Sequence, residues 1–308
     1  VGPVSQRVRA KVWSARSSTS SVLRVYCARL CITVGTSPKK MQHSCGITFC
    51  TRNAPGREEK TDYMMDRMRH AAVIFGVTDD TRDLVEALYL AFLGALNGHF
   101  EEYPYLLGWR PCLGDFGLLG PLYAHLGRDP YPARLMQQRA PRVWRWVERM
   151  NRADQDAPEY LNTGDDFLAD DAVPDTLLAV LRVVANDFMP ETRASAEFVN
   201  QWLAEHAPKG GTPAVGRLAE APGSAAFLVD GQQITALAQP YRHFQLQRVH
   251  QLVSALADRE RSAVMALLDS CGFVQLLSIS LNRTIEREGN LERWGPPKDE
   301  GLKKRERN

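Results

Sequence analysis

The stretch that decides the fold is PYLLGWRPCLGDF, residues Pro104–Phe116. Its first half contains Pro and Gly and favours an extended loop, and its second half continues into an apolar segment of helical periodicity. Cys112 is predicted to be the N-cap of that helix. Asp115, at the third helical position, can accept a hydrogen bond from the backbone N–H of the cap and so form half of a capping box. The segment is therefore predicted to be an ordered loop that leads into a buried helix.

Helical periodicity continues on the N-terminal side of this segment. An apolar stripe at helical spacing ends at Gly76 and consists of Met64, Met68, Ala72 and Phe75. Thr78 is then predicted to be the N-cap of a second helix. Asp79 and Asp80 would lie in its first turn, where the helix dipole favours negative charge.

On the C-terminal side, Pro141 is typical of the first turn of a further helix. The arginines of that helix, Arg142, Arg145 and Arg149, are predicted to form a solvated face. An acidic loop over 152–172 carries no His or ordered ligand spacing and leads into two predicted helical stretches, 177–188 and 196–206. Asp230-Gly231 predicts one hairpin turn, followed by two more helices. The fold is thus predicted to be mainly α with one small β-hairpin.

Residues 61–151 resemble the C-terminal helical domain of the glutathione S-transferase superfamily. The resemblance rests on the family pattern Y-L-L-G-x-x-P-S-x-A-D, which residues 105–115 follow, and on the blocks 120–130, 139–143 and 147–151. It implies a glutathione S-transferase C-terminal-like helical bundle. The region 173–294 looks like the helical extension of a bacterial-type branch of that superfamily.

Two residues of the pattern carry the structural expectation. Asp115 matches the structural Asp of the family, whose role is in folding and not in catalysis. Cys112 stands where the family usually has Ser or Thr. A thiol is a poor acceptor, so this cap should be weaker by about 0.5–1.5 kcal/mol.

The charge of the chain is divided unevenly. Residues 1–57 hold ten Lys and Arg and no acidic residue, whereas residues 58–308 hold 28 basic and 36 acidic residues, a net charge of −8. An acid-free, Ser- and Arg-rich leader is typical of an organelle transit peptide. The first methionine is Met41, and a fragmentary or frame-shifted coding sequence explains the composition equally well. The predicted organisation is a basic, disordered leader over 1–60, the helical domain over 61–160, the extension over 161–294 and a disordered tail over 295–308.

Several classes of protein are excluded by composition. No stretch approaches the roughly 18–20 apolar residues that a membrane span needs. The body has two cysteines, Cys112 and Cys271, too few for a disulfide framework. A cytoplasmic location is expected, or a mitochondrial one if the leader is a transit peptide. Nothing resembles a nucleic-acid-binding module. No metal site is predicted, because the leader cysteines lack the spacing of structural zinc ligands: Cys27, Cys31, Cys45 and Cys50.

The resemblance leaves two functions open. In the first, the chain is the electrophile-side half of a glutathione-conjugating enzyme that acts on a small apolar electrophile, with a possible homodimer. Glutathione is then a co-substrate only if a thioredoxin-like domain is present, and the chain as it stands is expected to be inactive. In the family the first helix of this domain lines the pocket, so Met64, Met65 and Met68 are predicted pocket residues, with core packing as the alternative for each. In the second, the chain is a non-catalytic interaction module.

Overall fold

The computed structural model describes residues 55–152, 157–161, 164, 166–214, 223–289 and 291–297. Within them the chain is mainly helical, with two antiparallel hairpins where one was predicted. Residues 1–54 of the predicted leader and residues 298–308 of the predicted tail lie outside the described residues. None of the described helices combines the length and the apolar character needed to cross a membrane.

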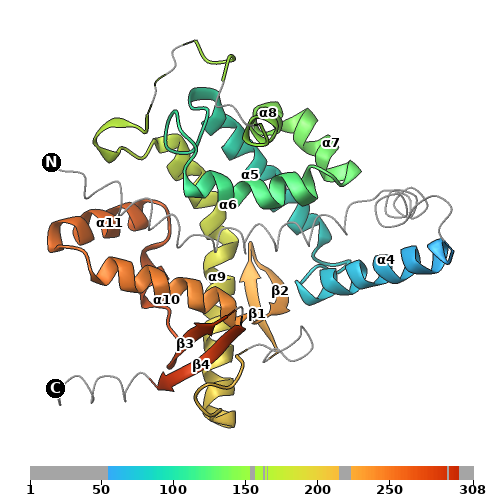
Figure 1. Ribbon diagram of the computed structural model, residues 1–308, viewed down its shortest axis with the longest axis vertical. Coiled ribbons are helices and arrows are strands. Elements are labelled where there is room, and N and C mark those ends of the chain that lie inside the picture. The colour runs from blue at the N-terminus through green and yellow to red at the C-terminus, as the bar shows by residue number, and fades with distance from the viewer. Residues whose placement is uncertain are drawn as a thin grey trace.

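One long helix, α9 (Asp175–His206), runs through the centre of the molecule (Figure 1). Helix α5 (Arg82–Glu102) packs against one part of it and strand β1 (Ser224–Val229) against another. The separate stretches predicted over 177–188 and 196–206 are therefore one helix of 32 residues, with Pro190 in its interior. Pro190 cannot donate a backbone hydrogen bond, but its neighbours Met189 and Glu191 are buried, so packing holds the helix together across the proline.

The upper half of Figure 1 is the bundle that contains the decisive segment. Besides α5 it consists of α6 (Leu113–Pro121), a π-helical turn (Leu122–Leu126), α7 (Pro130–Arg139) and α8 (Pro141–Met150). Its core includes the stacked rings of Phe100 and Trp146, whose centroids are 5.2 Å apart. The helix at Pro141 is confirmed, whereas α7 was not predicted.

The start of α5 corrects the predicted cap. Thr81, not Thr78, precedes the helix. The Thr81 hydroxyl donates to the carbonyl of Gly76 (2.8 Å) and accepts the backbone N–H of Thr78 (2.9 Å), so it closes the turn between the two helices. A threonine that closes a turn and one that caps a helix look alike in a sequence, because both use the same hydroxyl group.

The lower half contains both hairpins, α10 (Pro240–Ser254) and α11 (Asp258–Ser270). Strands β1 and β2 (Gln232–Leu237) meet at Asp230-Gly231, as predicted, and both turn residues have positive φ, as this turn type requires. The second hairpin pairs β3 (Arg283–Glu288) with β4 (Leu291–Pro297). Strand β4 includes residues 295–297, so the tail predicted to be disordered begins within a strand.

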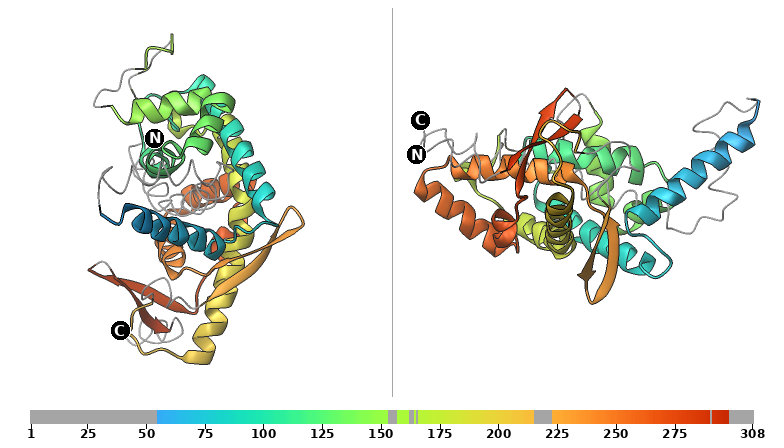
Figure 2. Two further views of the ribbon diagram at one scale, coloured as in Figure 1. Left: turned by 90° about the vertical axis from the view of Figure 1, so that its right-hand side faces the viewer. Right: turned by 90° about the horizontal axis from the view of Figure 1, so that it is seen from below.

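Helix α4 (Arg57–Ile74) projects from the rest of the molecule (Figure 2). It begins inside the predicted leader over 1–60, which is therefore helical from Arg57. Its C-terminal end rests on β2 at Gly76, where a Cβ atom would lie 2.5 Å from the Ile234 side chain. The positive φ of Gly76 and this close approach both require glycine.

Candidate functional site

The predicted capping box is present, and it is the centre of a larger group that we call the cap cluster: Asp115, Cys112, Leu106 and Trp146. Asp115 is fully buried and accepts the backbone N–H of Cys112 (2.9 Å) and of Leu106 (3.2 Å) and the indole N–H of Trp146 (3.1 Å). Burial raises the pKa of Asp115 to about 6, against the opposing effect of these N–H groups. The cluster fixes both ends of the loop before α6.

The chemistry of Cys112 is that of a structural residue. Its side chain is buried, and burial together with the neighbouring Asp115 raises the pKa of the thiol. A buried thiol with a raised pKa is unreactive, because the thiolate is the nucleophile. Cys271, the other described cysteine, is also buried.

The other side of the same loop is held by Arg149 and His99. Arg149 forms an ion pair with Glu159 and donates to the carbonyl of Pro104 (2.7 Å). Its guanidinium lies over the rings of Tyr105 and Tyr160, at 5.4 and 5.6 Å. The prediction of a solvated arginine face is thus wrong for Arg149, which is 3% exposed. Helical periodicity could have indicated the burial of Arg149, because it lies about one turn from buried Trp146. Its ion-pair partner Glu159 could not be found in this way, because it lies in a loop without a periodic pattern.

His99 is buried and neutral. Burial lowers its pKa to about 4, so at neutral pH one ring nitrogen carries a proton and the other does not. Nε2 faces the carbonyl of Tyr105 (3.3 Å) and therefore donates, and Nδ1 accepts from the hydroxyl of Thr176 (2.9 Å). His99 thus joins the loop to the start of α9, and both of its nitrogens are in use.

The predicted pocket methionines lie on α4, away from both cavities described below. Met65 is buried and Met64 half-buried, while the side chain of Met68 lies outside the described part of the structure. Neither Met64 nor Met65 lines these cavities. Their role in a pocket stays a prediction.

A second buried polar group, which the sequence did not reveal, joins α9 to α10. We call it the seam, and it consists of Glu191, Thr192, Ser195, Arg242 and His243. Arg242 pairs with Glu191 (2.8 Å) and donates to the Thr192 hydroxyl (3.1 Å), and Ser195 Oγ lies 3.0 Å from His243 Nε2. Glu191 and Ser195 are four residues apart on α9, so they lie on one face of the helix. This spacing of four was the only signal of the seam that the sequence offered. It did not identify the partners on α10, because they lie some 50 residues away in the sequence.

His243 differs from His99 in having one unused nitrogen. Its Nδ1 is buried without a hydrogen-bond partner in the described structure. Burial, and then the positive charge of Arg242, lower the pKa of His243 to about 3, so the ring is neutral. A Ser–His contact of this kind is found in nucleophilic catalysis, but there a third group orients the histidine through its other nitrogen. Ser195 is 2% exposed and His243 has no such partner among the described residues, so the geometry favours a structural role.

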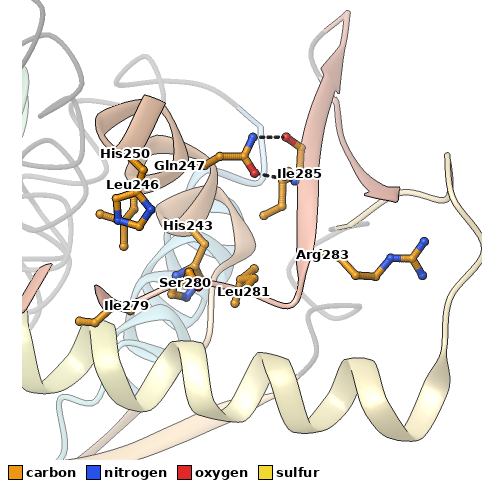
Figure 3. Close-up of a pocket in the computed structure, with 9 residues that line it drawn as sticks. All are labelled: His243, Leu246, Gln247, His250, Ile279, Ser280, Leu281, Arg283 and Ile285. Carbon is orange, nitrogen blue, oxygen red and sulfur yellow. Dashed lines mark hydrogen bonds between the residues drawn. The ribbon is translucent and has the colours of Figure 1, made fainter. Parts of the chain in front are cut away.

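A small cavity adjoins His243 (Figure 3). Its volume of about 10 Å³ is close to what one water molecule needs. Across it, the Gln247 amide exchanges two hydrogen bonds of 3.0 Å with the backbone of Ile285 and so ties β3 to α10. The remaining polar residues of the wall include His250, Ser280 and Arg283.

A larger hollow of about 440 Å³ lies between α9 and the segment after α11, and we call it the α9 hollow. Ile279 and Ser280 line both this hollow and the small cavity, so the two adjoin. The polar residues of the α9 hollow come from α9 and from the segment after α11: Arg193, Glu197, Asn200, Gln275, Ser278 and Ser280.

The remaining predictions concern metals and relatives. Within the described residues, no group of three His, Cys, Asp or Glu side chains is placed to hold a metal ion. The leader cysteines, Cys27, Cys31, Cys45 and Cys50, lie outside those residues. Comparison of the chain with protein-family models, with curated proteins and with solved structures finds no match.

Proposed function

We propose that the helical body is the electrophile-side half of a glutathione S-transferase-like protein, and that the chain does not conjugate glutathione by itself. The observation that supports the proposal is the cap cluster. The sequence pattern behind the resemblance implies a structural Asp at the third position of a buried helix. Asp115 occupies that position and is fully buried, and its carboxylate accepts a hydrogen bond from the backbone N–H of the cap residue Cys112.

The proposed lack of activity follows from the chemistry of the thiol. Transfer of glutathione to an electrophile needs a group that stabilises the thiolate. The resemblance places that group in a thioredoxin-like domain, and we assign none of the described residues to this task. The two described thiols are buried and serve packing.

The test uses the two substrates separately. The purified full chain is passed over immobilised glutathione and is expected not to be retained. It is then titrated with an apolar fluorescent dye, which a small aryl halide electrophile is expected to displace. Tight retention on glutathione would refute the assignment to the electrophile side alone. Failure to bind the dye would favour the second candidate.

The predicted pocket wall is tested on α4 itself. Met64 is half-buried, so Met64→Gln should leave the fold intact and weaken dye binding about fivefold, because it replaces an apolar wall by an amide. Val73→Gln is the matched control on the same helix, since Val73 is 57% exposed, and it should leave dye binding unchanged. Equal effects of the two variants would remove Met64 from the pocket.

The second candidate is a non-catalytic interaction module, and the projection of α4 favours it (Figure 2). Tyr63 and Val73 on this helix are 60% and 57% exposed, and both would be available to a partner. The genomic DNA upstream and in the other reading frames distinguishes the two candidates. A coding region for a thioredoxin-like fold there supports the transferase half and argues against the module.

A further inference from the structure

The α9 hollow carries two opposite charges that form no ion pair with each other in the described structure. Arg193 and Glu197 are exposed and lie four residues apart, about one helical turn, on the rim. Arg193 donates across the hollow to the side-chain carbonyl of Gln275. Within the described structure no ion pair joins it to Glu197, whose carboxylate has no described partner. Both charges are therefore available to a ligand.

The hollow is held in shape at both ends. At one end Arg193 bonds to Gln275. At the other, Asn200 donates to the carbonyl of Ser280 (3.0 Å) and accepts the backbone N–H of Asn282 (2.8 Å). These bonds fix the segment after α11 against α9. A ligand would thus meet a preformed site and would not have to order it, which reduces the entropic cost of binding.

Two of the eight residues that line the hollow are apolar, and the other six are polar or charged. Ala196 and Ile279 line it, and each is itself largely buried. The volume of about 440 Å³ is within the range of small-molecule sites. A ligand that matches this arrangement has one positive group, one negative group and a short apolar part between or beside them.

We propose that the α9 hollow binds a free amino acid with an aliphatic side chain. The guanidinium of Arg193 has donors left after its bond to Gln275 and takes the carboxylate of the ligand. Glu197 takes the ammonium group, and the side chain rests on Ala196 and Ile279. The site lies in the region of the predicted helical extension, outside the cap cluster and α4, so it does not depend on the proposed transferase function.

The first experiment tests the class of ligand on the unaltered chain. L-leucine is titrated into the protein and its heat of binding is measured. Two analogues follow, each of which keeps the aliphatic part and only one charge: isoamylamine and 4-methylpentanoate. Each analogue should bind at least about tenfold more weakly than leucine, because each leaves one rim charge without a partner. Absence of leucine binding, or equal binding of leucine and an analogue, would overturn the proposal.

The second experiment tests the two residues. Arg193→Gln and Glu197→Gln should each weaken leucine binding about tenfold, and Glu205→Gln, an exposed control on the same helix, should leave it unchanged. All three positions are exposed, so the unfolding midpoints should stay close to that of the unaltered chain, with the largest shift in Arg193→Gln because that variant also loses the bond to Gln275. Leucine binding of unchanged strength in both hollow variants would show that the charges do not hold the ligand.

Discussion

The cap cluster and the seam are both buried and polar, but they join parts of the chain at very different separations. Asp115 takes two of its hydrogen bonds from residues three and nine positions before it, whereas every described bond of the seam between α9 and α10 spans about 50 residues. The cap cluster therefore fixes one loop, and the seam fixes two helices relative to each other. The clusters also differ in completeness, because the seam leaves His243 Nδ1 without a partner.

The largest effect is expected from breaking the ion pair of the seam. Arg242→Met leaves the carboxylate of Glu191, which is 7% exposed, as an unpaired buried charge, and should lower the free energy of unfolding by about 3–5 kcal/mol in urea denaturation. The double variant Arg242→Met/Glu191→Leu should recover most of that loss, because no buried charge then remains. A loss below about 1 kcal/mol in the single variant would mean that water reaches Glu191.

Removal of the acceptor in the cap cluster should have the next largest effect. Asp115→Ala leaves the N–H groups of Cys112, Leu106 and Trp146 buried without an acceptor, and we expect a loss of about 2–4 kcal/mol in the same assay. If the two clusters are independent, this loss and that of Arg242→Met should add within about 0.5 kcal/mol. Strong non-additivity would show that they act as one unit.

The two clusters should respond to acid with opposite sign. The pKa of His243 is lowered from 6.5 to about 3 in the folded chain, so below pH 6.5 the unfolded chain binds a proton that the folded chain does not. The free energy of unfolding therefore decreases as the pH is lowered. Between pH 7.5 and 4.5 this loss is about 2–3 kcal/mol, and His243→Gln should remove it from urea unfolding curves measured at the two pH values.

The pKa of Asp115 is instead raised from 3.8 to about 6, so the folded chain binds its proton first, and stability gained from this group increases as pH falls through 6. The destabilisation caused by Asp115→Asn should therefore be larger at pH 4.5 than at pH 7.5. A destabilisation that is independent of pH would mean that Asp115 keeps its charge throughout this range.

The smallest effect concerns the cap residue itself. Cys112→Ser supplies the hydroxyl acceptor that N-caps prefer and should raise the free energy of unfolding by about 0.5–1 kcal/mol. Cys112→Ala, which has no acceptor, is the comparison. Equal stabilities of the Ser and Ala variants would show that the side chain at this position contributes packing only.

Much of the fold could be predicted because its signals are local. Asp230-Gly231 predicts its hairpin from two residues, and Asp115 predicts its capping box from a spacing of three. Gly289-Asn290 is a hairpin dipeptide of the same kind, so the second hairpin also had a usable signal. That hairpin is held in place by the Gln247 amide on Ile285, from 38 residues away, and by backbone bonds from residues 211–214 to β4, and neither set of contacts has a local signature.

The failed predictions share a physical cause. Pro190 weakens a helix locally, yet α9 continues because the residues on either side of the proline, Met189 and Glu191, are buried. Arg149 looks like a surface residue, yet it is buried because Glu159, a backbone carbonyl and two aromatic rings compensate most of its charge and donors, although its Nε has no hydrogen-bond partner in the described structure. In each case the loss in local energy is offset by contacts between segments that are distant in the sequence.

The sequence by itself therefore determined the helix at Pro141, the first hairpin and the capping box of Cys112 and Asp115, since their hydrogen bonds close over a few residues. Only the tertiary structure decided that α9 is one helix, that a seam joins it to α10, and that Arg193 and Glu197 face a hollow with a preformed wall. Those features depend on which side chains meet across about 50 to 80 residues of chain, and burial at such contacts changes the energy of a charge more than any local preference does.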